Sequence, residues 1–282
     1  MHLLDLMTPP KSSTVDYSAD IQVYPSRPDD RYAPSPLAAV DPFSAPHSVS
    51  KSDCPHGLPP LSRVSPWLIS LAYPVGRHAL LPFYFQQIEV SGQEHLPHSG
   101  AVILAPTHRS RWDAFMIPYV AGHDITGRHL RFMVSANEMT GLQGWFIRRM
   151  GGFPIDPKRP TIASLRHGVE LLQAGETLVI FPEGDIYRDK QVQPLKPGLA
   201  RLALQAEASR AHLGITIVPI SICYSEPLVP WRCRVAIRIG KPLKVADYNT
   251  AAPKQQAKKL TDDLQQALST ISDDVDDRSE AK

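Results

Sequence analysis

Residues Ala101–Phe115 read AVILAPTHRSRWDAF, and the expected fold is built outward from this stretch. An apolar run rich in β-branched residues stops at Pro106, which predicts a strand that ends there. His108 and Asp113 follow at once, separated only by polar residues and a tryptophan. The sequence therefore predicts a functional site that begins where this strand ends.

The spacing of His108 and Asp113 decides whether their side chains can meet. On one continuous α-helix, residues five positions apart point about 140° away from each other, so the two would not be in contact. They can meet if His108 lies in the loop and a helix begins near Ser110, its N-cap, with Asp113 in the first turn. The alternative is that Ser110 and Asp113 form only a capping box, and the spacing alone favours this simpler interpretation.

Composition limits the class of protein. The chain has 282 residues and 43% apolar content, which favours one large α/β domain over two small ones. The formal net charge of +2 argues neither for nor against nucleic acid; we expect none as a partner, and any anion site must come from local clusters of charge. Cys54, Cys223 and Cys233 share no metal-ligand spacing and are too few for a disulfide framework, which indicates a reducing compartment. The N-terminus lacks the basic flank and long apolar core of a cleavable signal, so we expect the protein to stay inside the cell.

The chain divides into four expected regions. Residues 1–60 hold 11 of the 28 prolines and nine serines, with few recurring apolar positions, so we expect a flexible tail. An apolar helical segment at 61–88 comes next. The main domain is expected at 89–250, and a C-terminal helix with an acidic tail at 251–282.

The apolar segment is a candidate for docking on a membrane. Arg77 is the only charge between residues 66 and 86. Pro74, Gly76 and Pro82 divide this stretch into pieces too short to cross a bilayer, which needs about 20 helical residues. Two short helices with aromatic residues at their ends would suit the lipid interface, but a pair of ordinary core helices fits equally well.

Strand and helix patterns alternate along the rest of the chain. Expected strands cover residues 88–92, 101–106, 130–134, 153–155, 177–181, 215–222 and 234–239, and expected helices cover about 110–122, 137–150, 161–173, 199–208 and the chain from 253 onward. This order is typical of an α/β fold, and we expect an αβα sandwich with a mixed, largely parallel sheet, preceded by the apolar helical segment. The strand at 177–181 runs into Pro182–Asp185, a second place where polar residues follow a strand end. Because ligands of parallel α/β sheets bind beyond such ends, the two can form one site.

Four blocks occur in the order seen in glycerophospholipid acyltransferases: His108-x4-Asp113, Gly152–Asp156, Phe181–Gly184 and Val218–Pro219. On these blocks the chain resembles the PlsC type, the 1-acylglycerol-3-phosphate acyltransferase family, over roughly residues 85–245. The resemblance implies a membrane-associated enzyme on the cytoplasmic face, acyl-CoA or acyl carrier protein as donor, and no cofactor or metal. It implies lysophosphatidic acid (1-acylglycerol 3-phosphate) as acceptor and phosphatidic acid as product, with another lysolipid or glycerol 3-phosphate as alternative acceptors.

The resemblance also implies roles for four residues. His108 would be the general base, because a neutral imidazole can accept the proton of a glycerol hydroxyl as that hydroxyl attacks the thioester. Asp113 would fix the imidazole tautomer and steady the cation that forms. Glu183 and Gly184 match the acceptor-binding block, where a carboxylate contacts glycerol hydroxyls and backbone N–H groups meet phosphate.

The second block departs from the family's pattern. The family usually places an arginine directly after the aspartate, but Pro157 follows Asp156 here, and Lys158 and Arg159 come next. We expect Lys158 and Arg159 to supply the phosphate-binding charge that the family places earlier.

The third block departs as well. Asp185 and Ile186 stand where the family usually has threonine and arginine, and Arg188 comes two residues later. An acidic Asp185 beside a phosphate would be unfavourable unless it faces away. Arg188 and Lys196 are therefore further candidates for the phosphate site.

Other classes of function fit less well. A histidine with carboxylates at strand ends could bind a metal for hydrolysis, but no second histidine lies at ligand spacing and no H-E-x-x-H pattern occurs. A Gly-x-Ser-x-Gly elbow and the Walker and dinucleotide glycine loops are also absent from the sequence. A lipid-binding module without activity is the main rival, and the intact His108 and Asp113 argue against it.

Overall fold

The computed structural model describes residues 64–156, 162–210, 213–248 and 252–280. By their contacts these residues belong to one unit, Pro59–Lys282. The expected tail at 1–60 lies outside the described residues, and so do Lys158 and Arg159.

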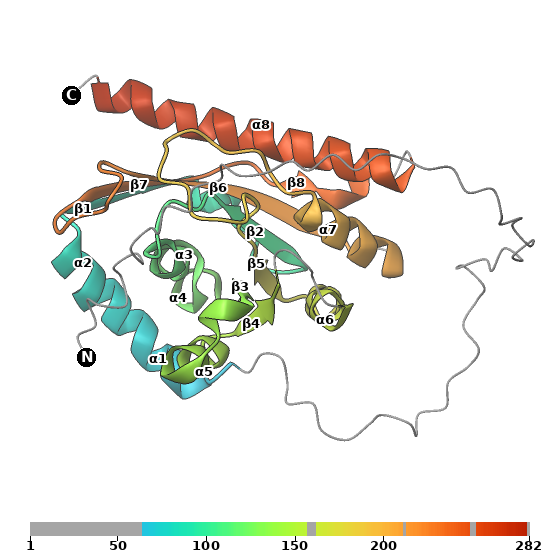
Figure 1. The fold of residues 1–282 in the computed structure, drawn as a ribbon, viewed down its shortest axis with the longest axis horizontal. Coiled ribbons are helices and arrows are strands. Elements are labelled where there is room, and N and C mark those ends of the chain that lie inside the picture. Colours follow the sequence, from blue (N-terminus) through green and yellow to red (C-terminus); the bar gives the residue numbers. More distant parts are fainter. Residues whose placement is uncertain (1–63, 157–161, 211–212, 249–251, 281–282) are drawn as a thin grey trace, which may run out of the picture. The chain divides into compact units, whose positions relative to one another are not determined.

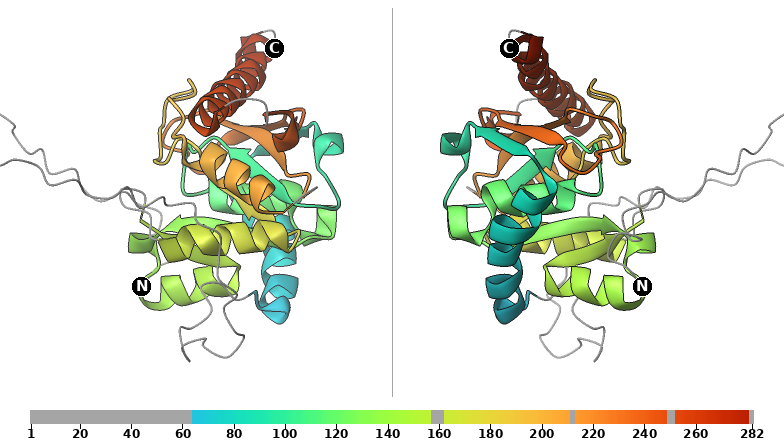
Figure 2. Two further views of the ribbon diagram at one scale, coloured as in Figure 1. Left: turned by 90° about the vertical axis from the view of Figure 1, so that its right-hand side faces the viewer. Right: turned by 90° about the vertical axis from the view of Figure 1, so that its left-hand side faces the viewer.

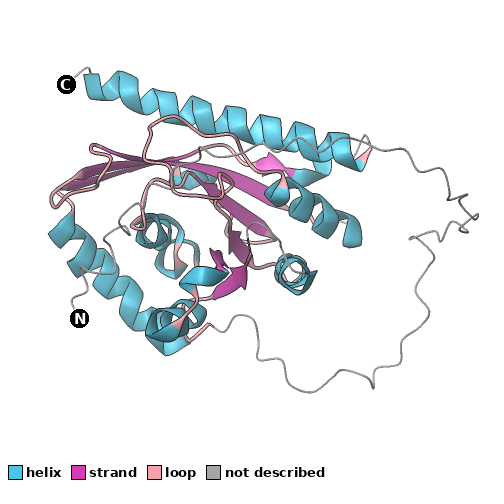
Figure 3. Ribbon diagram, in the orientation of Figure 1, coloured by secondary structure: helices cyan, strands magenta, loops and turns pink. Residues whose placement is uncertain are grey.

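An eight-stranded sheet forms the centre of this unit (Figures 1 and 3). Its strands are β1 (Gln87–Ser91), β2 (Val102–Pro106), β3 (Leu130–Ser135), β4 (Gly152–Ile155), β5 (Thr177–Val179), β6 (Thr216–Tyr224), β7 (Arg234–Ile239) and β8 (Leu243–Lys244). The order across the sheet is β1-β7-β6-β2-β5-β3-β4, and β8 pairs with β6. β6 is antiparallel to β7 and β8, whereas all the other neighbours are parallel. The predicted mixed, largely parallel sheet is confirmed.

Helices cover both faces of the sheet (Figures 1 and 2). One face carries α6 (Ile162–Gln173), α7 (Gly198–Ser209) and α8 (Pro253–Glu280), and the other carries α3 (Asp113–Ala121) and α4 (His123–Thr126). Ile103 and Ala105 of β2 join the core beneath α6, α7 and α8, while the alternate residues Val102 and Leu104 turn to the opposite face. A strand that is apolar on both faces must be covered on both, so the αβα prediction is confirmed.

The apolar segment forms one helical run rather than two separate short helices. The run consists of α1 (Pro66–Val75), a π-helical turn (Gly76–Leu80) and α2 (Leu81–Tyr84). Pro74 has no N–H to donate, and the wider π turn after it lets the helix continue, with the Leu81 N–H bonded to the Gly76 carbonyl. The expected interruptions at Pro74, Gly76 and Pro82 are therefore wrong. Within the described ranges, no helix is both long enough and apolar enough to cross a membrane.

Most of the other expected elements are present, with shifted ends. The helix expected at 110–122 begins at Asp113, so Ser110 is not its N-cap. The helix expected at 137–150 is divided into a 3₁₀ turn (Ala136–Glu138) and α5 (Gly141–Arg149). Gly141 has a φ of 56°, a left-handed conformation that interrupts a helical path. Two further 3₁₀ turns cover Gln93–His95 and Val245–Tyr248.

Candidate active site

The loops after β2 and β5 form one candidate active site. The two strands are parallel neighbours, with Leu104 opposite Val179, so both end at the same edge of the sheet. The His108 N–H donates a 2.9 Å hydrogen bond to Glu183 Oε2, and the Tyr187 N–H donates a 2.8 Å bond to the His108 carbonyl. These bonds join the two strand ends, as the sequence predicts.

His108 is held by the sheet and by an aromatic neighbour. Thr107, just before it, donates its N–H to the Ile220 carbonyl at 2.9 Å and accepts the Ile222 N–H on its hydroxyl at 2.9 Å, which ties the loop to β6. The His108 ring stacks on Phe181, with ring centroids 4.0 Å apart and planes at 23°. The His108 side chain is 20% exposed, so part of the ring is accessible from solvent.

Asp113 orients the His108 ring from the start of α3. His108 Nδ1 lies 2.9 Å from Asp113 Oδ2, which also accepts the N–H groups of Arg109 at 2.6 Å and Ser110 at 2.9 Å. Because a carboxylate oxygen only accepts, Nδ1 carries the hydrogen and Nε2 keeps a free lone pair in the neutral ring. Ser110 precedes the helix and is not its N-cap, so its bond to Asp113 closes the loop and does not form a capping box. One carboxylate thus closes the loop and orients the imidazole.

Tyr224, which lies outside the motifs recognised in the sequence, completes the surroundings of Asp113. Its hydroxyl donates a 2.7 Å hydrogen bond to Asp113 Oδ1 from the end of β6. Burial raises the pKa of the Tyr224 hydroxyl well above its usual value, and the neighbouring Asp113 carboxylate raises it further. The hydroxyl therefore stays protonated as a donor. Its position just after the strand expected at 215–222 could have indicated it as a site residue. That strand, β6, runs parallel to β2 and ends at the same edge of the sheet.

Arg109 and Glu183 form a buried ion pair beneath the site. Arg109 Nη1 lies 2.7 Å from Glu183 Oε2 and 3.0 Å from Oε1, and the two side chains are 5% and 0% exposed. Glu183 also accepts the N–H groups of His108 and Gln193. Both carboxylate oxygens are therefore bonded to the protein, and the pair connects the loop after β2 to the loop after β5. Arg109 was not among the predicted site residues.

Of the other predicted substrate-binding residues, the structure describes Gly184, Arg188 and Lys196. The Gly184 N–H is bonded to the Phe181 carbonyl at 3.1 Å, and the Gly184 carbonyl lies 3.4 Å from Lys196 Nζ. Lys196 and Arg188 are both exposed, and so is Asp185, whose side chain accepts the Ile186 N–H. The predicted contacts of Glu183 and Gly184 with acceptor stay predictions. In the part of the chain that the structure describes, no three histidine, cysteine, aspartate or glutamate side chains gather as metal ligands.

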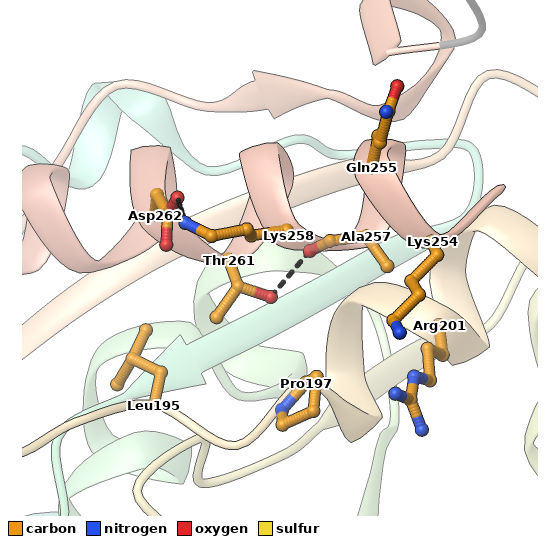
Figure 4. A pocket seen from close by; sticks show the side chains of 9 residues that line it. All are labelled: Leu195, Pro197, Arg201, Lys254, Gln255, Ala257, Lys258, Thr261 and Asp262. Atoms are coloured by element: carbon orange, nitrogen blue, oxygen red, sulfur yellow. Dashed lines mark hydrogen bonds and ion pairs between the residues drawn. The ribbon is translucent and has the colours of Figure 1, made fainter. Parts of the chain in front are cut away.

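A pocket of about 380 Å³ lies elsewhere, between α7 and α8 (Figure 4). Arg201, Lys254 and Lys258 contribute to its lining, together with Leu195 and Pro197. None of the lining residues is a predicted site residue, and none has a hydrogen bond or ring contact with His108. The candidate active site is therefore the cluster around His108 and not this pocket.

Comparisons with known proteins show what this chain is similar to. Residues 87–223 match the family described as Acyltransferase. A 1-acyl-sn-glycerol-3-phosphate acyltransferase of Bacillus subtilis is 25% identical over 67% of this chain and 90% of its own length. Another of the same name, from Streptococcus pneumoniae, is 26% identical over 51% of this chain, which spans about half (51%) of that relative. The crystal structure of PlsC, the 1-acyl-sn-glycerophosphate acyltransferase of Thermotoga maritima, has a similar fold, with a TM-score of 0.58, 19% identity, and coverage of 74% of this chain and 80% of the other.

Proposed function

Because this chain belongs to the PlsC-type acyltransferases, we propose that it moves an acyl chain from a thioester to the free hydroxyl of 1-acylglycerol 3-phosphate. The donor is acyl-CoA or acyl-acyl carrier protein, and the product is phosphatidic acid. The observation that carries the proposal is the 2.9 Å contact between His108 Nδ1 and Asp113 Oδ2, which leaves Nε2 free to act as a base. Relatives from two bacteria that are named for this reaction support the choice of acceptor.

The proposed reaction uses His108 as a proton carrier. Nε2 takes the proton of the acceptor hydroxyl as its oxygen forms a bond to the thioester carbonyl carbon. The Asp113 carboxylate stabilises the imidazolium, whose second hydrogen remains on Nδ1. The C–S bond then breaks, and the imidazolium returns its proton to the departing thiolate. The acyl chain passes directly from the sulfur to the acceptor oxygen, so the reaction needs no acyl-enzyme.

The proposed phosphate site draws on cations next to this centre. Lys196 Nζ lies 3.4 Å from the carbonyl of Gly184, which directly follows Glu183. Arg188 follows Tyr187, whose N–H is bonded to the His108 carbonyl. Both cations are exposed and one short segment away from the base. We assign phosphate binding to these two together with Lys158 and Arg159, because a phosphate monoester favours charge-assisted hydrogen bonds.

The proposed location is the cytoplasmic face of a membrane, where the lipid acceptor and product reside. Trp67 and Leu71 of α1 are 60% and 59% exposed, which supports docking by the apolar segment. Leu68 and Ile69 are buried, so that half of α1 packs in the core. The exposed side of α1 therefore fits the membrane-docking interpretation, and its buried side fits the interpretation as a core helix.

An assay of the purified protein tests the proposed function. Radiolabelled acyl-CoA and acyl-acyl carrier protein would each be offered with 1-acylglycerol 3-phosphate, glycerol 3-phosphate and a lysolipid without a phosphate monoester. We expect the fastest turnover with 1-acylglycerol 3-phosphate. A faster rate with another acceptor would reassign the substrate. Acceptor binding without turnover under every condition would show the inactive lipid-binding module instead.

A further inference from the structure

Exposed apolar side chains gather on three neighbouring segments of the fold. Among the described residues, ten large apolar side chains are exposed, and nine of them belong to the helical run α1–α2, to α5 and to the loop 228–232. They are Trp67, Leu71, Val75 and Phe83; Leu142, Trp145 and Phe146; and Leu228 and Trp231. Single exposed apolar residues are normal when scattered, but such a concentration marks an interaction surface. We call these nine side chains the apolar face.

The helical run presents its part of this face along one side. Trp67, Leu71, Val75, Ala79 and Phe83 recur at every fourth position. In an α-helix such a stripe rotates by about 40° at each step, and the wider π turn after Val75 offsets part of that drift. Val75, Ala79, Leu80 and Phe83 line one apolar hollow of about 420 Å³, which places these residues on a common side.

The other two segments adjoin the two ends of the run. At its start, the Ser65 N–H donates to the Arg149 carbonyl of α5 at 2.9 Å. At its end, Trp231 Nε1 donates to the Phe83 carbonyl at 3.1 Å, and the two rings lie 6.4 Å apart. Figure 1 shows α1 and α5 side by side, with α8 across the sheet from them. The three segments that carry the apolar face are therefore contiguous, from α5 along the run to the loop.

Charge indicates what covers the face. Residues 66–84, 141–149 and 228–232 contain four arginines and no aspartate or glutamate, and one of the four, Arg77, is paired with Asp124 at 3.4 Å. The Arg149 guanidinium lies 4.7 Å above the Trp145 ring, and that of Arg232 lies 5.6 Å from the Trp231 ring. Tryptophan prefers the level of lipid headgroups, and arginine beside it can reach anionic phosphates there.

We propose that α5 and the loop 228–232 join α1–α2 in a single face that rests on an anionic lipid bilayer, with the helical run lying along the surface. This inference deepens the proposed function, since the proposed acceptor is a lipid, but it concerns binding rather than chemistry. It makes α5 and the loop two separate contact points beyond the N-terminal helices.

Flotation of the full chain with phosphatidylglycerol–phosphatidylcholine vesicles tests the inference. Leu142→Glu on α5 and Leu228→Glu in the loop change side chains that are 77% and 74% exposed, so both variants should keep the wild-type melting temperature. Gln266→Glu on α8 is the matched control, because it adds the same charge at an exposed position across the sheet. We expect each face variant to bind vesicles about tenfold more weakly or worse, because each loses a leucine side chain that the bilayer would bury. The control should bind vesicles as tightly as wild type.

Several outcomes would overturn the inference. Equal flotation of both face variants and wild type would exclude these contact points, and equal flotation with pure phosphatidylcholine would exclude the anionic surface. A wild-type dimer in lipid-free buffer that both face variants convert to monomers would assign the face to a second copy of the chain. Acyl transfer measured with acceptor in detergent micelles separates the two proposals, because we expect the face variants to retain wild-type turnover there even when flotation is lost.

Discussion

The hydroxyl of Tyr224 is bonded at 2.7 Å to Asp113 Oδ1, the carboxylate oxygen that does not contact His108. Asp113 Oδ2 meanwhile accepts two backbone N–H groups and His108 Nδ1. The carboxylate is thus held from the sheet on one side and from the loop on the other. A ring whose partner is fixed at both oxygens keeps one orientation, as general-base catalysis needs.

Tyr224→Phe should therefore lower kcat by about tenfold, because it removes a buried hydrogen bond of roughly 1–3 kcal/mol to the carboxylate that orients the base. KM for donor and acceptor should change little. Tyr248→Phe is the matched control, since Tyr248 donates a 2.8 Å bond to Asp263, a carboxylate on α8. Initial rates and melting temperatures of both variants would be compared. Equal loss of stability with unchanged kcat in both would reduce Tyr224 to a structural role.

His108→Ala should abolish transfer and leave the fold intact, because a loop residue at a strand end contributes little packing. Asp113→Asn should lose less. The asparagine oxygen can still accept from His108 and the loop N–H groups if its amide nitrogen faces Tyr224, whose hydroxyl can also accept. Turnover is measured beside near-ultraviolet circular dichroism. Near-normal turnover of His108→Ala would refute the general-base role.

Glu183→Gln should lower stability by about 3–5 kcal/mol, because it leaves the buried Arg109 without its counter-charge. Glu170→Gln is the control, since its pair with Arg166 is exposed on α6 and such pairs contribute about 1 kcal/mol or less. Urea unfolding would report both changes. A raised acceptor KM with no loss of stability would instead favour the predicted contact of Glu183 with glycerol hydroxyls.

Local patterns were sufficient to predict most of the fold. The apolar runs at 101–106 and 215–222 became strands that are buried along almost their whole length, and such a strand can be predicted from consecutive apolar residues. The continuous helical run was not predicted, because proline and glycine usually end helices and no local sequence pattern indicates a π turn. The apolar pattern also could not predict which side of α1 is buried, because Leu68 and Leu71 are equally apolar but only Leu68 packs in the core.

The candidate site was predictable where its parts are close in sequence or follow the ends of two expected strands. His108 and Asp113 are five residues apart, so their contact followed from the position of a loop and a helix start. Glu183 follows the end of β5, where a second group of polar residues was expected. Tyr224 reaches the same cluster from β6, and the place of β6 in the sheet depends on long-range packing that one sequence does not display. Arg109 was missed because an arginine is usually exposed, whereas here a buried carboxylate neutralises it.

Acid should destabilise the fold partly through His129, whose ring stacks on His123. Burial lowers the pKa of His129, and the nearby His123 and Arg131 lower it further. Below the usual histidine value of about 6.5 the unfolded chain therefore takes up a proton that the folded chain resists, so stability falls as pH decreases through that window. His129→Phe should flatten the melting temperature between about pH 7 and pH 5 relative to wild type. An identical slope in both proteins would contradict this assignment.

The phosphate-binding charge should come from cations displaced along the second and third blocks. Lys158→Ala, Arg159→Ala, Arg188→Ala and Lys196→Ala would each be assayed alone. A charge-assisted hydrogen bond contributes roughly 1.5–3 kcal/mol, so losing a phosphate ligand should raise the acceptor KM by about tenfold or more. KM for the donor should barely move.

Two controls separate a phosphate ligand from a surface charge. Lys258→Ala removes an exposed cation that pairs with Asp262 on α8, and it should change neither KM. Wild type and each of the four site variants should use an acceptor without the phosphate monoester equally well, because that acceptor cannot form the cation–phosphate bond that the substitution removes. If Lys158→Ala and Arg159→Ala weaken both acceptors equally or neither, the second block does not hold the phosphate. Selective weakening by Lys196→Ala or Arg188→Ala alone would then move the site to the loop after β5, beside the buried pair that connects it to His108.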